Sequence, residues 1–153
     1  MERRSGRGVV TVTAVRPISN GAPGYTTSLP CDPESARMAR RLVVASLNTW
    51  GLGDLADVGK LVVSELVSNS VRHTSCRLIK VSVQRVGTDR VRIGVTDKSR
   101  RLPEMGAGDS GQEDGRGLLL VEVMADRWGY DEFRWGKTVW VELVVAKDDE
   151  ATS

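Results

Sequence analysis

The chain has 153 residues, about the length of one domain, and 40% of them are hydrophobic, which is enough for a compact core. Its 22 basic and 20 acidic side chains leave a net charge of +2. The first 24 residues hold four arginines and one glutamate, so the rest of the chain is close to neutral. A near-neutral body argues against nucleic acid as the main partner, because phosphate binding needs a concentrated basic surface.

The sequence also bears on where the protein is located and on whether it binds a transition metal. No apolar run approaches the ~20 residues that span a bilayer, and the N-terminus lacks the apolar segment of a secretory signal. We therefore expect a soluble cytoplasmic protein. Cys31 and Cys76 lack CxxC spacing, and His73 is the single histidine, so a transition-metal site is not expected. The two thiols are read as bystanders in a reducing cytosol, with a disulfide or metal pair as the alternative.

The first half of the chain predicts a tail, a strand and two helices. Residues 1–24 are rich in arginine, glycine, serine and proline, which predicts a mobile basic tail. Residues 25–29 alternate as an edge strand does. Asp32 is placed to cap a helix that runs to about residue 50, where glycines end it. A second helix is expected from about residue 54 or 57 to residue 73.

The second half predicts two hairpins around an irregular segment. The expected elements are strands at 78–86 and 91–96, a glycine-rich loop at 97–117, a helix at 118–126, strands at 128–133 and 138–145 joined by a turn at 134–137, and a polar tail at 147–153. This order predicts an α+β two-layer sandwich, with helices on one face of a mixed, mostly antiparallel sheet. It is not the alternating βαβ pattern of a Rossmann domain.

The second predicted helix carries the most informative polar residues. Glu65, Asn69 and Arg72 fall within a sector of roughly 60°, beside the apolar stripe. An amide oxygen is a hard neutral ligand that suits Mg²⁺, and a nearby carboxylate can accept a hydroxyl proton. The alternative interpretation is a solvated polar border that only supports the helix.

Two further features stand at the ends of predicted elements. Asp97 ends an alternating strand, where a carboxylate can accept a hydrogen bond from an exocyclic amine or simply form an Asx turn. The segment Gly115-Arg116-Gly117-Leu118 leads into a helix, where glycines and a helix N-terminus suit phosphate. It is not a Walker loop, and an ordinary helix-entry turn is the alternative.

Taken together, these features resemble a known superfamily. The segments ELVSNSVRHT, VTDKSRRLP and GRGLLLVEVMADRWG, followed by GKTVWVEL, resemble the N box and glycine boxes of the GHKL (histidine-kinase-like) ATPases. Within that superfamily they look like the anti-sigma-factor serine/threonine kinase branch of the RsbW and SpoIIAB type, in its stand-alone actinobacterial form. The resemblance covers about residues 25–145. It implies a Bergerat-type ATP-binding domain at 25–146.

The resemblance also implies roles for individual residues, with ATP and Mg²⁺ as cofactors. Asn69 is expected to coordinate Mg²⁺, Glu65 to act as general base, and Asp97 to bond the adenine amine. Residues 103–117 are expected to form the ATP lid. Gly115 and Gly117 are expected to lie beside the phosphates when the lid closes, and Leu118 is expected to contribute to nucleotide binding. Arg116 is expected either to contact phosphate or to face solvent. Thr138 is expected to support the adenine end from the neighbouring strand.

The sequence departs from the superfamily pattern in two places. Ser99 and Arg101 replace both glycines of the DxGxG box, which makes the loop beside the adenine bulkier. The lid segment is acidic, so Mg²⁺ or nearby arginines must offset its charge beside a triphosphate.

At this length we do not expect a phosphoacceptor-histidine, transducer or sensor domain within the sequence. By resemblance, the leading hypothesis is an anti-sigma factor and serine/threonine kinase that phosphorylates a STAS-domain anti-anti-sigma partner and sequesters a sigma factor. A homodimer is left open, and neither nucleic acid nor membrane is expected as a direct partner. The alternatives are an ATP-responsive binding module without kinase activity and a pseudo-ATPase that admits no nucleotide.

Overall fold

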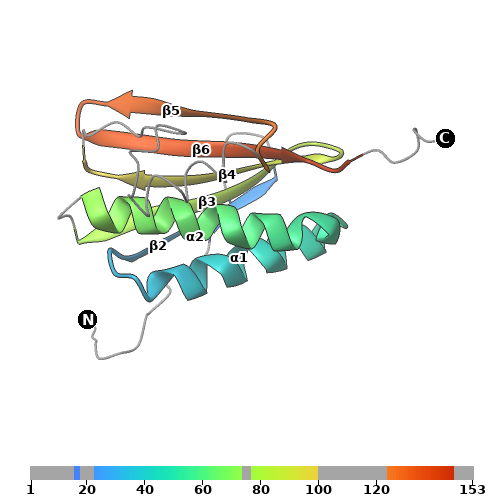
Figure 1. Cartoon of the computed structure of the whole chain (residues 1–153), viewed down its shortest axis with the longest axis horizontal. Coiled ribbons are helices and arrows are strands. Elements are labelled where there is room, and N and C mark those ends of the chain that lie inside the picture. Colours follow the sequence, from blue (N-terminus) through green and yellow to red (C-terminus); the bar gives the residue numbers. More distant parts are fainter. Residues whose placement is uncertain (1–15, 18–22, 74–76, 100–123, 147–153) are drawn as a thin grey trace.

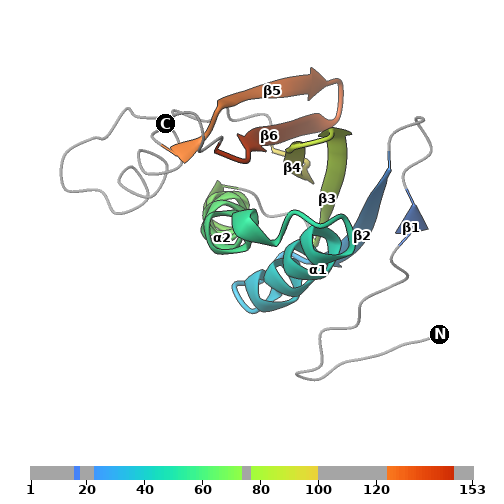
Figure 2. The ribbon, with the colours of Figure 1, turned by 90° about the vertical axis from the view of Figure 1, so that its right-hand side faces the viewer.

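The computed structural model describes residues 16–17, 23–73, 77–99 and 124–146. These residues form two layers, a sheet and a pair of helices that lie side by side on one face of it (Figures 1 and 2). The sheet has six strands in the order β1-β2-β3-β4-β6-β5. In chain order the elements are β1 Arg16–Pro17, β2 Gly24–Pro30, α1 Ser35–Thr49, the 3-10 helix η1 Gly53–Leu55, α2 Ala56–His73, β3 Leu78–Gly87, β4 Arg90–Asp97, β5 Arg127–Phe133 and β6 Gly136–Val144.

The structure confirms the predicted α+β sandwich and corrects its details. All strand pairs within the described residues are antiparallel, so the sheet is not mixed there. β2 begins at Gly24, inside the segment expected to be a tail, and β1 pairs with it. The last turn is shorter than predicted, because Gly136 and Lys137 already belong to β6. Residues 118–123, which hold most of the third predicted helix, lie outside the described residues.

The helix boundaries follow from local chemistry. The predicted cap by Asp32 is wrong, because the N-cap of α1 is Glu34, which makes no side-chain cap hydrogen bond. Asp32 instead forms a turn before the helix, where its Oδ1 atom accepts a hydrogen bond of 2.8 Å from the backbone N–H of Glu34. Gly51 has a φ of 73°, a left-handed conformation that suits glycine, and it follows the end of α1. Within the described residues, no helix is long and apolar enough to cross a membrane.

The core lies between the helices and the sheet. Buried side chains at helical spacing on α1 and α2 meet the alternate apolar residues of the three central strands, which are Ile79, Val81, Val83, Val91, Ile93, Val95, Val139, Val141 and Leu143. Gly59 lets α2 approach α1 closely, since a Cβ there would stand 2.9 Å from Cγ1 of Val43. Because side chains alternate along a strand, the residues that continue the phase of these apolar positions also face the helices. This holds at the last position of β4 and at the start of β6.

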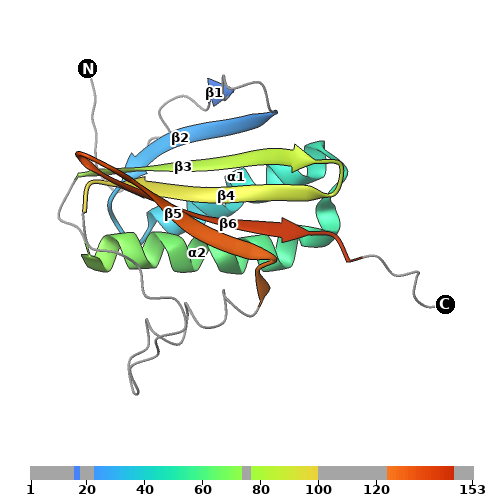
Figure 3. The ribbon, with the colours of Figure 1, turned by 90° about the horizontal axis from the view of Figure 1, so that it is seen from above.

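The opposite face of the sheet, seen from above in Figure 3, carries a buried ion-pair cluster. Glu142 is 2% exposed and accepts hydrogen bonds from Arg90 at 3.0 Å and Arg92 at 2.6 and 2.9 Å. Arg127 lies 3.0 Å from the same carboxylate. The guanidinium of Arg92 also lies over the Trp140 ring, with its Cζ 4.2 Å from the centroid.

Replacing Glu142 with Gln is expected to destabilise the fold by about 1–2 kcal/mol at neutral pH. Burial tends to raise the pKa of Glu142, but the hydrogen bonds of Arg92 and Arg90 and the charges of Arg92 and Arg127 outweigh it and lower that pKa. The carboxylate therefore stabilises the fold above its unfolded pKa, and this contribution is lost as the pH falls through the lowered folded value. The expected cost is modest because the arginines remain partly in water.

Urea unfolding at pH 7 measures this effect. Glu132→Gln is the matched control, because Glu132 is an exposed residue of β5. Equal unfolding midpoints for the two variants would show that the cluster contributes nothing to stability.

Candidate functional site

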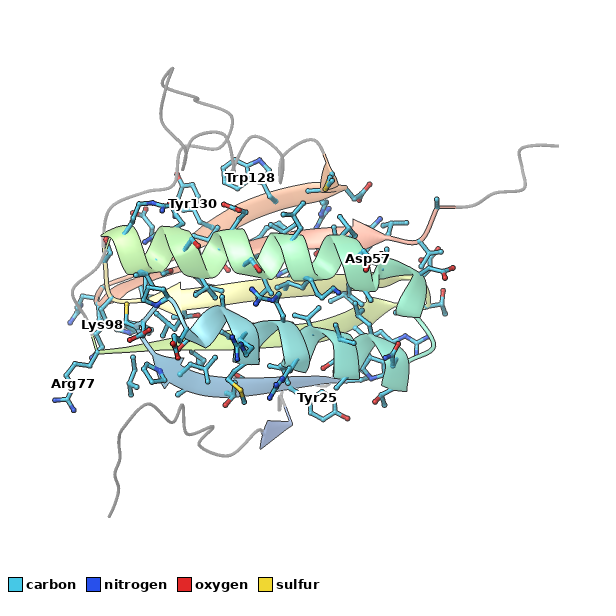
Figure 4. The ribbon with its side chains drawn as sticks, turned by 60° about the horizontal axis from the view of Figure 1, so that its bottom comes forward. Tyr25, Asp57, Arg77, Lys98, Trp128 and Tyr130 are labelled. Atoms are coloured by element: carbon cyan, nitrogen blue, oxygen red, sulfur yellow. The ribbon has the colours of Figure 1, made fainter. Side chains whose placement is uncertain are left out.

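The predicted site residues gather where β4 ends. Figure 4 shows Lys98, the residue after β4, at the end of the sheet where α2 finishes, while Asp57 in the first turn of α2 lies at the opposite end. Asp97 is 2% exposed there, and Asn69 and Ser70 on α2 are also buried. The antiparallel pairing of β4 with β6 sets Lys137 beside Asp97. One end of the sandwich thus holds polar groups from three elements.

Asp97 is held by three donors. The Ser70 hydroxyl donates to its Oδ2 atom at 2.6 Å, and the Lys137 ammonium donates to Oδ1 at 2.9 Å. The backbone N–H of Ser99 also donates to Oδ1, at 2.9 Å. An ionised carboxylate can accept about four hydrogen bonds. With respect to the described residues, the carboxylate therefore keeps one acceptor position, on Oδ2. The Asx turn left open by the sequence forms on its other oxygen.

Lys137 is a residue that sequence reasoning missed. Its side chain and that of Asp97 are each 1% exposed, so they form a fully buried ion pair. Its Nζ also lies 3.4 Å from the Ser99 carbonyl oxygen. The prediction had placed Lys137 in a turn, but its period-2 phase with the apolar residues of β6 sets it on the face toward α2. That alternation was the signal available in the sequence.

Gly136 allows β6 to approach the end of β4. A Cβ at this position would collide with the carbonyl oxygen of Asp97 and would stand 2.8 Å from Cα of Lys98. Both are backbone atoms, which cannot move aside as a flexible side chain can. The glycine thus permits the register that brings Lys137 to Asp97.

Thr138 lies next to this cluster along β6 but on the other face of the sheet. Its register partner is Thr96, and their hydroxyl oxygens are 2.6 Å apart. Because side chains alternate along a strand, Thr138 points away from the face that carries Asp97. Lys137, and not Thr138, is the β6 residue that contacts the carboxylate. The expected support of the adenine end by Thr138 stays a prediction.

Glu65 and Asn69 lie one turn apart on α2. Burial raises the pKa of Glu65, and the charge of Arg72 opposes that shift without cancelling it. Asn69 is 4% exposed. Its amide oxygen is a hard, neutral ligand of the kind that suits Mg²⁺.

The remaining predicted residues lie outside the described residues. They are Gly115, Arg116, Gly117, Leu118 and the lid segment 103–117.

A two-layer sandwich with a buried carboxylate at the end of β4, against the last turn of α2, is the arrangement of an ATP-binding domain of the histidine-kinase-like class. The family described as "histidine kinase-like ATPase domain" matches residues 29–143, and the chain belongs to that family. The predicted superfamily is thereby confirmed, and ATP is the ligand that the domain implies.

Two individual proteins are also similar. An uncharacterized protein of Streptomyces coelicolor, SCO4941, is 44% identical over 43 residues, which cover 27% of this chain and 41% of that protein. The histidine kinase domain from the Erythrobacter litoralis EL346 blue-light activated histidine kinase is similar in structure, with a TM-score of 0.48 and 19% identity. That match covers 76% of this chain and 61% of the other.

The described residues fit ATP and Mg²⁺ by their chemistry. Among the described residues, Asp97 accepts three hydrogen bonds and so has one acceptor position left for a base, and Asn69 offers a hard amide oxygen. Both groups come from the core-facing side of rigid elements, which favours a preformed site.

Proposed function

We propose that this chain is a cytoplasmic serine/threonine kinase that uses ATP to phosphorylate a STAS-domain anti-anti-sigma protein, and that it binds a sigma factor as an anti-sigma factor. The observation that carries the proposal is the pair Glu65 and Asn69, one turn apart on α2, beside the buried Asp97 cluster. A module that only bound ATP would have no need for a half-buried carboxylate near the metal-binding amide.

Each residue has a defined part in this proposal. Asp97 would accept a hydrogen bond from the adenine amine on its Oδ2 atom. Asn69 would hold Mg²⁺, which supplies positive charge against the triphosphate when bound. Glu65 would accept the proton of the incoming serine hydroxyl, so that the serine oxygen can bond to the γ-phosphorus while ADP leaves. Catalysis then rests on positioning and electrostatics.

The partner would be recruited from outside the site. In this proposal the described residues would bind the nucleotide and provide the base, while the acceptor serine would come from the STAS-domain protein. A switch between sigma factor and STAS partner would follow from which nucleotide is bound and whether the STAS serine is phosphorylated. A homodimer of this chain is compatible with that switch.

Incubation with γ-labelled ATP and a STAS-domain protein encoded beside its gene tests the proposal. We expect label on a serine of the STAS protein and release of ADP. ATP binding without label transfer would contradict the kinase and favour an ATP-responsive binding module. Failure to bind ATP would contradict both and favour a pseudo-ATPase.

A further inference from the structure

We infer that Lys137 is a positioning residue that balances the buried charge of Asp97 and fixes its orientation, and that it thereby makes the site select a 6-amino purine over a 6-oxo purine. The inference rests on the proposed binding of the adenine base by Asp97. It does not depend on phosphate transfer.

The first step concerns charge. Asp97 is almost fully buried, and an isolated carboxylate in such a place is strongly disfavoured in its charged form. Lys137 is its ion-pair partner within the described residues, at 2.9 Å and equally buried. Without this cation, the carboxylate would be left in the interior with no opposite charge beside it. Lys137 therefore balances the charge of Asp97 and holds it in place.

The second step concerns geometry. Lys137 and the Ser99 N–H both donate to Oδ1, while Ser70 donates to Oδ2. The ammonium also donates to the Ser99 carbonyl oxygen at 3.4 Å. Oδ1 is therefore held from two sides, by the segment after β4 and by the start of β6. This arrangement fixes the rotation of the carboxylate and leaves the remaining acceptor position on Oδ2.

The third step concerns the base. A carboxylate oxygen accepts hydrogen bonds, so Oδ2 of Asp97 suits the exocyclic amine of adenine and repels the 6-oxo group of hypoxanthine. Without Lys137, Oδ1 would lose its donor from β6, and the carboxylate could rotate away from the 6-position of the base. The contact with Lys137 is thus what makes Asp97 a discriminating group.

Calorimetric titration with ATP and with inosine triphosphate measures this directly, because these nucleotides differ at the 6-position of the base. For the wild-type chain we expect ATP to bind at least about 100-fold more tightly. Lys137→Met should weaken ATP binding about tenfold or more and reduce the ratio of the two affinities to about threefold or less. Lys137→Arg keeps the charge and should keep most of the wild-type ratio.

Lys80→Met is the matched control, because Lys80 is an exposed residue of β3, and it should behave as wild type. If Lys137→Met does not fold, Lys137→Gln provides the same comparison, since its amide can still donate to Asp97 without a charge. The ratio of the ATP affinity to the inosine triphosphate affinity should fall in this variant as well.

Equal weakening of both nucleotides in the neutral variants, with the ratio kept, would overturn the inference and leave Lys137 a purely structural residue. A wild-type chain that binds both nucleotides equally, or neither, would also overturn it. If the affinity ratios are as expected but no phosphate is transferred to the STAS protein, the inference about Lys137 stands and the proposed kinase activity is contradicted. Failure of the inference and failure of the proposed function are therefore distinguishable.

Discussion

Replacing Glu65 with Gln is expected to lower the rate of phosphate transfer to the STAS protein by about 100- to 10,000-fold. The amide keeps the size and helix propensity of the side chain but cannot accept the serine proton. ATP affinity should change by less than about threefold, since Glu65 is not among the residues proposed to hold base or metal. Single-turnover transfer and calorimetric ATP binding measure the two quantities separately.

Asp57→Asn is the matched control for this variant. Asp57 is an acidic residue of the same helix, but it is fully in water at the opposite end of the sheet (Figure 4). Its transfer rate should equal that of wild type. A Glu65→Gln variant that transfers phosphate as fast as Asp57→Asn would remove Glu65 from the mechanism.

The same carboxylate sets the pH dependence of transfer. Burial raises the pKa of Glu65 above its ordinary value of 4.5. A general base works only when unprotonated, so the wild-type rate should fall as the pH drops through this raised value. The residual rate of Glu65→Gln should lack that step. Rate profiles of both proteins at acidic to neutral pH test the difference.

Replacing Gly136 with Ala is expected to destabilise the fold by about 2–4 kcal/mol and to weaken ATP binding. The new Cβ would meet the backbone of Asp97 and Lys98, so the end of β4 and the start of β6 must separate. That separation would pull Lys137 from Asp97 and leave two buried charges poorly paired. Urea unfolding measures the loss of stability.

Gly87→Ala is the control for this substitution. Gly87 ends β3 at a hairpin, and a Cβ there would lie 3.5 Å from Cβ of Arg90, which is ordinary van der Waals contact. Its free energy of unfolding should change by less than about 1 kcal/mol. If the two alanine variants unfold at the same urea concentration, the close approach at Gly136 is not a constraint on the fold.

Much of the fold was predictable because the sequence is strongly periodic. Helical spacing of apolar residues marked α1 and α2, and strict alternation marked β3, β4 and most of β6. The predicted starts of β2 and β6 differed from those in the structure by one and two residues. The start of β6 depends on the contact between Gly136 and β4, which no local pattern reveals.

The candidate site was assembled from the sequence only in part. Glu65, Asn69 and Asp97 stand at the ends or borders of elements, where spacing alone left a structural interpretation open and the family resemblance implied function. Ser70 and Lys137 were missed because their role depends on which strand face meets α2. A lysine assigned to a turn is expected to be in solvent, whereas the register of β6 buries it against Asp97.

The central claim is that this end of the sandwich binds ATP with Mg²⁺ through α2. Calorimetric titration of the wild-type chain and of Asn69→Ala with ATP, in the presence of Mg²⁺, tests it most directly. We predict saturable binding to wild type and about tenfold or more weaker binding to Asn69→Ala, because the variant lacks the amide oxygen that would hold the metal. Equal affinity in the two proteins, or no binding to wild type, would contradict the claim.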